Sequence, residues 1–182
     1  NFGGMQVKAQ RMQPVSKPVI IKINSENINS KLSISNKITE LFYLFGGRLI
    51  TNNDVLEEQD IRKRVLFTSS NYSWVKEGNP YGFVDMTPPP SDEILENTPL
   101  ALILEGKFKS KYTDTEIPDW PADPAADSEE GAEEITQPSE ILGEPQSNQL
   151  IVIGCTNMFK NDVLGSAPAH RAFLQNCVDA LT

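Results

Sequence analysis

The sequence predicts an α/β fold, with a mostly parallel sheet flanked by helices, from two observations near its C-terminal end. Residues 150–153 (Leu-Ile-Val-Ile) form an unbroken apolar run dominated by β-branched side chains. A run without polar alternation is typical of a strand covered on both faces, as strands are in a parallel sheet. Residues 168–181 show helical periodicity and begin at Pro168, whose missing N–H would have no partner in a first turn. Together these stretches predict a strand, a loop and a helix, and they define no chemistry.

The predicted C-terminal helix has an apolar side and a polar side. Its apolar residues follow the i, i+3/4, i+7/8 rule, and the other positions are interpreted as its solvent-facing side. The predicted apolar residues are Phe173, Leu174, Cys177, Val178 and Leu181. The predicted polar residues are His170, Arg171, Gln175, Asn176 and Asp179.

Four further apolar runs, at residues 18–23, 41–45, 64–68 and 99–104, predict strands. The run at 41–45 is rich in aromatic residues, which favours a strand, and a short helix from Ser35 is the alternative. Residues 69–74 form a polar loop with an aromatic end. The connector at 75–98 contains Pro88-Pro89-Pro90, a triplet that forces an extended conformation and forbids a helix.

Charge is distributed unevenly along the 182 residues, whose formal net charge is −9. Residues 113–149 hold 11 of the 25 acids, five prolines and no Lys or Arg, whereas the remaining 14 acids nearly balance the 16 bases. We therefore expect one α/β domain fragment over 1–182, with a flexible acidic insertion at 113–149 that Trp120, Ile141 and Leu142 hold locally. Its central part, residues 123–138, is predicted to lack regular secondary structure. The sequence has no clustered basic face, so nucleic-acid binding is not predicted.

The chain begins with Asn1-Phe2-Gly3-Gly4, without a start Met or a signal-peptide apolar region. No apolar run approaches the roughly 20 residues that a membrane-spanning helix needs. We therefore expect a soluble piece excised from a longer protein.

Enzymatic chemistry would have to start from Cys155, which follows a predicted strand, with His170 as its base, since the sequence has a single His. The helix dipole disfavours an imidazolium in the first helical turn, and no Gly-x-Cys-x-Gly turn surrounds Cys155. A buried Cys155 and a solvated His170 are the preferred interpretation. Cys155 and Cys177 are interpreted as free, buried thiols, with a disulfide as the alternative. One His, two separated Cys and no glycine-rich phosphate loop predict neither a metal site nor a cofactor.

Three stretches resemble a known family. They are residues 68–74 (TSSNYSW), residues 99–110 (PLALILEGKFKS), and residues 150–154 continuing to Asn161 and to 173–176 (FLQN). In this order they resemble the GldG-like family, auxiliary subunits of uncharacterised ABC-type transport systems, some of which are linked to gliding motility. The resemblance extends from about Pro18 to Thr182 and is most specific at residues 99–110.

This resemblance implies a fold related to flavodoxin-like or class I amidotransferase-like sheets, here incomplete. It also implies a parent protein anchored by transmembrane helices, with permease and ATPase subunits as partners and with this region outside the cytoplasm. Relatives often have Gly-Asp-Ser-Asp-Phe after the last strand, where this chain has Gly154-Cys155-Thr156-Asn157-Met158. Because both acids are absent, the resemblance carries no metal or acid–base role to this loop.

The resulting hypothesis is a non-enzymatic domain at the periplasmic or extracytoplasmic face of the cytoplasmic membrane, which binds a partner subunit or a ligand. The expected contact residues are Ser69, Asn71, Trp74, Glu105, Lys107, Thr156 and Asn157. One alternative is an amidotransferase-like hydrolase that uses Cys155. Another is an envelope glycan-binding module with Tyr72, Trp74 and Trp120 as stacking surfaces, although burial of Tyr72 and Trp74 is the preferred interpretation of these two aromatics.

Overall fold

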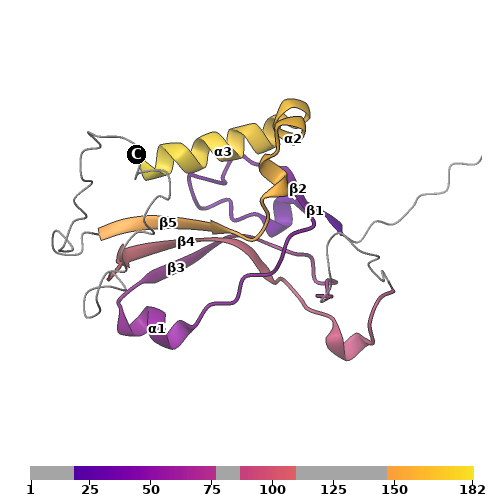
Figure 1. The fold of residues 1–182 in the computed structure, drawn as a ribbon, viewed down its shortest axis with the longest axis horizontal. Helices are drawn as coiled ribbons and strands as arrows, with labels where there is room; N and C mark the ends of the chain where they lie inside the picture. The colour runs from indigo at the N-terminus through magenta and orange to yellow at the C-terminus, as the bar shows by residue number, and fades with distance from the viewer. Residues whose placement is uncertain (1–18, 77–86, 110–146) are drawn as a thin grey trace, which may run out of the picture.

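The computed structural model describes residues 19–76, 87–109 and 147–182, which contain five strands and three α-helices (Figure 1). The strands are β1 (Ile20–Asn24), β2 (Glu40–Leu44), β3 (Arg62–Thr68), β4 (Pro99–Lys107) and β5 (Ser147–Ile153). The helices are α1 (Asn53–Glu58), α2 (Asn161–Ser166) and α3 (Pro168–Leu181). Short 3-10 turns occupy Ser25–Asn27, Ser91–Glu93 and Asn157–Phe159.

Both sheets are antiparallel, so the prediction of a mostly parallel, flavodoxin-like or amidotransferase-like sheet is wrong. β1 pairs with β2, and β4 lies between β3 and β5, with every pairing in the described ranges antiparallel. Among the described strands β5 is therefore at the edge of its sheet, and Leu150 is 46% exposed. An apolar run shows that a strand lacks a polar face, but it determines neither the direction of the neighbouring strand nor how completely the second face is covered.

The predicted strand positions are confirmed, because each of the five apolar runs overlaps a strand. The run at 41–45 belongs to β2, so the alternative of a short helix there is wrong. The C-terminal helix is confirmed as α3, with Pro168 in its first turn. In the sequence, the acidic segment at 113–149 follows β4 and runs into β5. Its last three residues begin β5, whereas residues 113–146, including the predicted irregular part 123–138, lie outside the described residues.

One hydrophobic core joins both sheets and α3. Phe173 of α3 is fully buried and packs edge-to-face against Phe67 of β3, with 5.6 Å between ring centroids. Tyr43 of β2 also packs edge-to-face against Phe67, with 6.3 Å between the ring centroids. Val178 and Leu181, which were predicted to belong to the apolar side of the helix, are instead 49% and 52% exposed.

A close approach of two glycines joins β2 to the end of β5. The N–H of Gly47 donates a 2.8 Å hydrogen bond to the carbonyl oxygen of Gly154. A Cβ atom on Gly154 would lie 2.3 Å from the carbonyl oxygen of Gly47 and 2.4 Å from the hydroxyl of Tyr43, so only glycine is accommodated there. The same Tyr43 hydroxyl donates to the Gly47 carbonyl at 2.6 Å. Burial, reinforced by the nearby Cys155 thiol, raises the pKa of Tyr43, which keeps this hydroxyl a hydrogen-bond donor.

Candidate functional site

His170 is buried, so the prediction that it is solvated is wrong. Its Nε2 atom lies 2.9 Å from the backbone nitrogen of Phe42, and its Nδ1 atom lies 3.0 Å from the carbonyl oxygen of Met158. Because the Phe42 N–H can only donate, Nε2 must be the unprotonated acceptor, and Nδ1 carries the hydrogen that is donated to Met158. Burial lowers the pKa of His170, which favours this neutral form.

Cys155 is also buried, as predicted, at 4% exposure. Its thiol donates to the carbonyl oxygen of Leu44 at 3.2 Å, and the side-chain amide of Asn157 donates to the same oxygen at 3.0 Å. Cys177 is buried as well, and both cysteines are free, so the disulfide alternative is wrong. Burial raises the pKa of the Cys177 thiol to about 11, which keeps it protonated at neutral pH.

Cys155 and His170 therefore do not form a nucleophile–base pair. Both ring nitrogens of His170 are held by backbone atoms, so neither is available to accept the proton of the thiol. The histidine instead links β2 to the 3-10 turn that follows β5. Sequence reasoning missed this role, although His170 lies three residues before Phe173 and seven before Cys177, on the same helical stripe.

The polar loop after β3 is held by a network around Ser69, a predicted contact residue that is 1% exposed. The hydroxyl of Ser69 lies 2.8 Å from that of Ser73 and accepts from the Thr98 N–H at 3.1 Å. The Asn27 side chain donates to the Ser69 carbonyl at 2.9 Å. All these bonds are internal, so Ser69 holds the loop in place and does not present its hydroxyl at the surface.

The same loop exposes aromatic surface. Tyr72 is 58% exposed and lies edge-to-face with the half-buried Trp74, at 6.0 Å between ring centroids. The preferred interpretation of two buried aromatics is therefore wrong for Tyr72. Asn71, another predicted contact residue, is exposed beside it. Trp120, the third aromatic of the glycan-binding alternative, lies outside the described residues.

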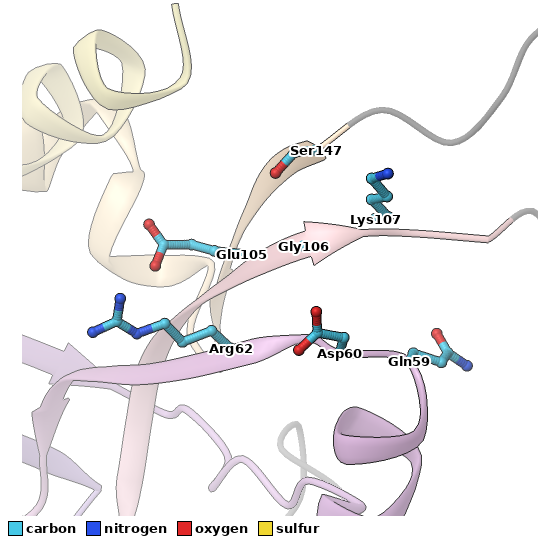
Figure 2. Close-up of a pocket in the computed structure, with 7 residues that line it drawn as sticks. All are labelled: Gln59, Asp60, Arg62, Glu105, Gly106, Lys107 and Ser147. Atoms are coloured by element: carbon cyan, nitrogen blue, oxygen red, sulfur yellow. The ribbon is translucent and has the colours of Figure 1, made fainter.

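A polar hollow of about 430 Å³ lies at the opposite end of the three-stranded sheet, where β3 and β5 begin and β4 ends (Figure 2). Its lining residues are Gln59, Asp60, Arg62, Glu105, Gly106, Lys107 and Ser147. β4 approaches the α1–β3 turn closely here, because a Cβ atom on Gly106 would lie 3.0 Å from the carbonyl oxygen of Asp60.

The charges in this hollow are only partly paired. Glu105 forms an ion pair with Arg64 and also accepts a 2.9 Å hydrogen bond from the Gln149 side chain. Arg62 and Lys107 have no ion-pair partner among the residues that the structure describes. Their side chains diverge rather than converge on one point (Figure 2). The hollow is therefore an open polar surface rather than a cradle for one small anion.

The structure does not bring the seven predicted contact residues into one site. Glu105 and Lys107 line the hollow, whereas Ser69, Asn71 and Trp74 follow the far end of β3, about 20 Å away at the rise of an antiparallel strand. Thr156 is exposed and Asn157 is half-buried after the end of β5, which is the end opposite the hollow. Arg62, which sequence reasoning missed, joins Glu105 through the β3–β4 register.

The described ranges contain no group of three His, Cys, Asp or Glu side chains that could hold a metal ion. Nor is any helix found in these ranges long and apolar enough to cross a membrane. What these elements define is a mixed α/β protein with two small antiparallel sheets and C-terminal helices, in which the potential nucleophile and base are held by backbone contacts.

A family model described as an ABC-type uncharacterized transport system matches residues 2–177. The chain therefore belongs to this family of auxiliary components of ABC-type transport systems, which confirms the resemblance seen in the sequence. No curated protein matches it significantly, and no solved structure does.

Proposed function

We propose that this chain is a non-enzymatic binding domain of the auxiliary component, and that it acts by contacting other subunits of the transport system. The observation that carries this proposal is the arrangement of Cys155 and His170. The thiol is buried against the Leu44 carbonyl, and both histidine nitrogens are occupied by backbone atoms. The amidotransferase-like alternative requires these two groups to be free for proton transfer, so it is not favoured.

Membership of the transport-system family supports permease and ATPase subunits as the partners. The polar hollow supports a contact role at one end of the sheet, because Asp60, Arg62 and Lys107 in its lining have no ion-pair partner among the described residues and can pair with charges of both signs on a partner surface. Their divergence favours an extended protein surface over a small ligand, since each charge would reach a separate group.

The location and the process belong to the same proposal. We place the domain at the extracytoplasmic face of the cytoplasmic membrane, in a parent chain anchored by transmembrane helices, on the resemblance to GldG-like proteins. That resemblance also supports a role in gliding motility. A fluorescent reporter fused to the parent chain tests the side of the membrane. We expect added protease to cleave the domain in intact spheroplasts.

Two matched cysteine variants test the non-enzymatic assignment. Cys155→Ser and Cys177→Ser each replace a buried free thiol, and only Cys155 has a role in the hydrolase alternative. We expect both variants of the full-length parent protein to co-purify with permease and ATPase subunits and to support transport equally. Loss of transport in folded Cys155→Ser, with Cys177→Ser unaffected, would replace this proposal by the hydrolase alternative.

The exposure of Tyr72 beside Trp74 favours a second candidate function, binding of an envelope glycan. Aromatic faces provide the apolar contact area that sugar rings stack on. A glycan array probed with the wild-type chain and with Tyr72→Ala tests this candidate. Binding that Tyr72→Ala abolishes would support it, whereas no binding, or binding that Tyr72→Ala leaves unchanged, would reject it.

A further inference from the structure

Three side chains from the C-terminal part of the chain bind backbone groups along one edge of β2. His170 of α3 accepts from the N–H of Phe42 at 2.9 Å. The carbonyl oxygen of Leu44, two residues further on, accepts from the Cys155 thiol at 3.2 Å and from the Asn157 amide at 3.0 Å. Because these side chains belong to α3 and to the turn after β5, they hold both elements against β2.

Of these three side chains, only His170 changes its charge when the pH falls below neutral, since an amide does not titrate and a thiol holds its proton below pH 7. Its Nε2 atom faces the N–H of Phe42, which can only donate. A proton on Nε2 would point at this donor and would place a charge on a residue that is 1% exposed. Turning the ring over does not help, because both nitrogens of the charged ring are donors. The protonated ring therefore cannot keep this contact.

No carboxylate among the described residues bonds to the ring to offset its charge, because its two partners are the backbones of Phe42 and Met158. The titratable and charged groups on the surrounding elements are Lys22, Glu40, Cys155, Lys160, Asp162 and Arg171. Glu40, the acid of β2, is paired with Lys22 at 2.7 Å. The Phe42 ring stacks on the imidazole with 6.1 Å between centroids, just beyond the roughly 6 Å reach of a cation–π contact.

We propose that these side chains form an acid-sensitive latch: uptake of a proton from solvent by His170 releases the turn after β5 and the first turn of α3 from the edge of β2. Phe173, three residues further along α3, is fully buried against Phe67 and keeps the rest of the helix in place. The released turn carries Thr156 and Asn157, so the surface that this part of the molecule offers to a partner depends on pH. Burial lowers the pKa of His170, as expected for a ring that the closed latch holds in its neutral form.

Proton linkage gives the size of the effect. In the open latch His170 is in water, with an ordinary pKa of about 6.5, whereas the closed latch resists the proton. Between pH 7 and 5 the ratio of open to closed molecules should rise by up to about 25-fold, the limit for a closed form that takes up no proton in this range. Aspartate and glutamate side chains stay largely ionised over the same range, and the sequence has a single His.

Thiol labelling of the full 182-residue chain tests the latch, because Cys155 belongs to it and Cys177 does not. Dithiodipyridine still reacts with thiols at acid pH, and mass spectrometry of peptides separates the two sites. We expect the protection of Cys155, relative to the same thiol in an unfolded peptide, to fall by about 5- to 25-fold from pH 7 to 5. Cys177, two turns beyond His170 in α3, should remain the better protected thiol at both pH values.

His170→Gln is the matched variant, because its side-chain amide can accept and donate hydrogen bonds and does not titrate. The protection of Cys155 in this variant should be the same at the two pH values. Hydrogen exchange of the Phe42 N–H in the wild type is a second readout, which does not require the variant to fold. Opening of this amide should increase by the same factor as the exposure of Cys155.

Three results would overturn the proposal. The first is protection of Cys155 and of the Phe42 N–H that stays constant between pH 7 and 5 in the wild type. The second is equal protection of Cys155 and Cys177 at pH 5, since both thiols would then be exposed only by complete unfolding. The third is the same fall in protection in folded His170→Gln, which would assign the effect to another group. All measurements use the chain alone, so their failure leaves the proposed function standing.

Discussion

His170 of α3 is bonded through Nε2 to Phe42 of β2 and through Nδ1 to Met158 of the 3-10 turn, and its replacement tests these two contacts directly. His170→Ala leaves the Phe42 N–H and the Met158 carbonyl without partners inside the protein. Each unsatisfied buried group costs about 1–3 kcal/mol, so we expect the free energy of unfolding to fall by about 2–5 kcal/mol in urea titrations. Arg171→Ala, at the exposed next position, should change it by less than about 0.5 kcal/mol. Equal effects of the two substitutions would contradict the hydrogen-bonded role of His170.

The lowered pKa of His170 also predicts how stability depends on pH. Above the unfolded-state pKa of about 6.5, both states hold a neutral ring and the contribution of His170 is complete. Below it, the unfolded chain takes up a proton that the folded chain resists, so the free energy of unfolding falls until the pH passes the lower folded-state pKa.

Because the sequence has one His, the difference between the wild type and His170→Gln isolates this effect. We expect the wild type to lose stability relative to the variant between pH 6.5 and 5, with a slope of at most about 1.4 kcal/mol per pH unit. Urea unfolding at a series of pH values measures the slope. A pH-independent difference would show that the ring is equally protonated in both states.

For single residues, the sequence predicted correctly that Cys155 is buried and incorrectly that His170 is exposed to solvent. Cys is an apolar residue in most proteins, so its burial follows from its type. His170 was assigned to the exposed side by its polarity, although its spacing from Phe173 and Cys177 places it on the buried stripe. Its backbone partners at Phe42 and Met158 are distant in sequence or belong to an irregular turn, so no local pattern identifies them.

At the scale of elements, α3 depends on one aromatic anchor. Phe173 is fully buried between Phe67 and Phe159, with ring centroids 5.6 and 6.3 Å away. Phe173→Ala should therefore lower the free energy of unfolding by about 3–5 kcal/mol in urea titrations. Gln175→Ala, on the exposed side of the same helix, should stay within about 0.5 kcal/mol. A small effect of Phe173→Ala would mean that α3 is not anchored by this ring.

The glycine contact between the sheets gives a second prediction for an element. Gly154→Ala would place a methyl group 2.3 Å from the Gly47 backbone, so the strand end must shift. We expect a loss of about 1–3 kcal/mol, as measured for overpacked sites, and a lower thermal midpoint. Gly165→Ala in α2 meets open space and should stabilise the chain by up to about 1 kcal/mol. Equal midpoints for the two variants would show that the contact is not a tight one.

The strands could be predicted from the sequence, but their arrangement could not. Apolar runs mark where β1 to β5 lie, because burial depends on local composition. Strand pairing depends on contacts between residues far apart in the chain, such as Leu104 with Leu150. No local sequence pattern indicates whether two paired strands run parallel or antiparallel. The helices α1 and α2 have only six residues each, too few to show helical periodicity.

For the candidate site, too, the sequence indicated which residues are polar but not which of them the fold leaves available. Glu105 and Lys107 were predicted to contact a partner, and they do lie together at the polar hollow. Ser69 was predicted as well, but its hydroxyl is used internally by Ser73 and Thr98. Residue type indicates that a polar group is available, whereas only the fold shows which groups are already satisfied.

At the scale of the whole molecule, both sheets should unfold together. The hydrophobic core includes Ile23 and Tyr43 from the two-stranded sheet, Ile103 from the three-stranded sheet and Phe173 from α3. A two-stranded sheet is marginally stable at best by itself, so β1 and β2 depend on this shared core. We therefore expect one cooperative transition rather than separate loss of each sheet.

Two probes in the Trp120→Phe variant test this prediction, because that substitution leaves Trp74 as the only tryptophan. Trp74 fluorescence reports on the loop after β3, and the NMR signals of the His170 ring report on the contact between β2 and α3. Their midpoints in urea should coincide. Gly154→Ala should then lower both midpoints by the same amount, since its clash lies at the contact between the sheets. Loss of the His170 signals at a lower urea concentration than the change in Trp74 fluorescence would show that the two-stranded sheet separates first, and that the shared core does not couple the sheets.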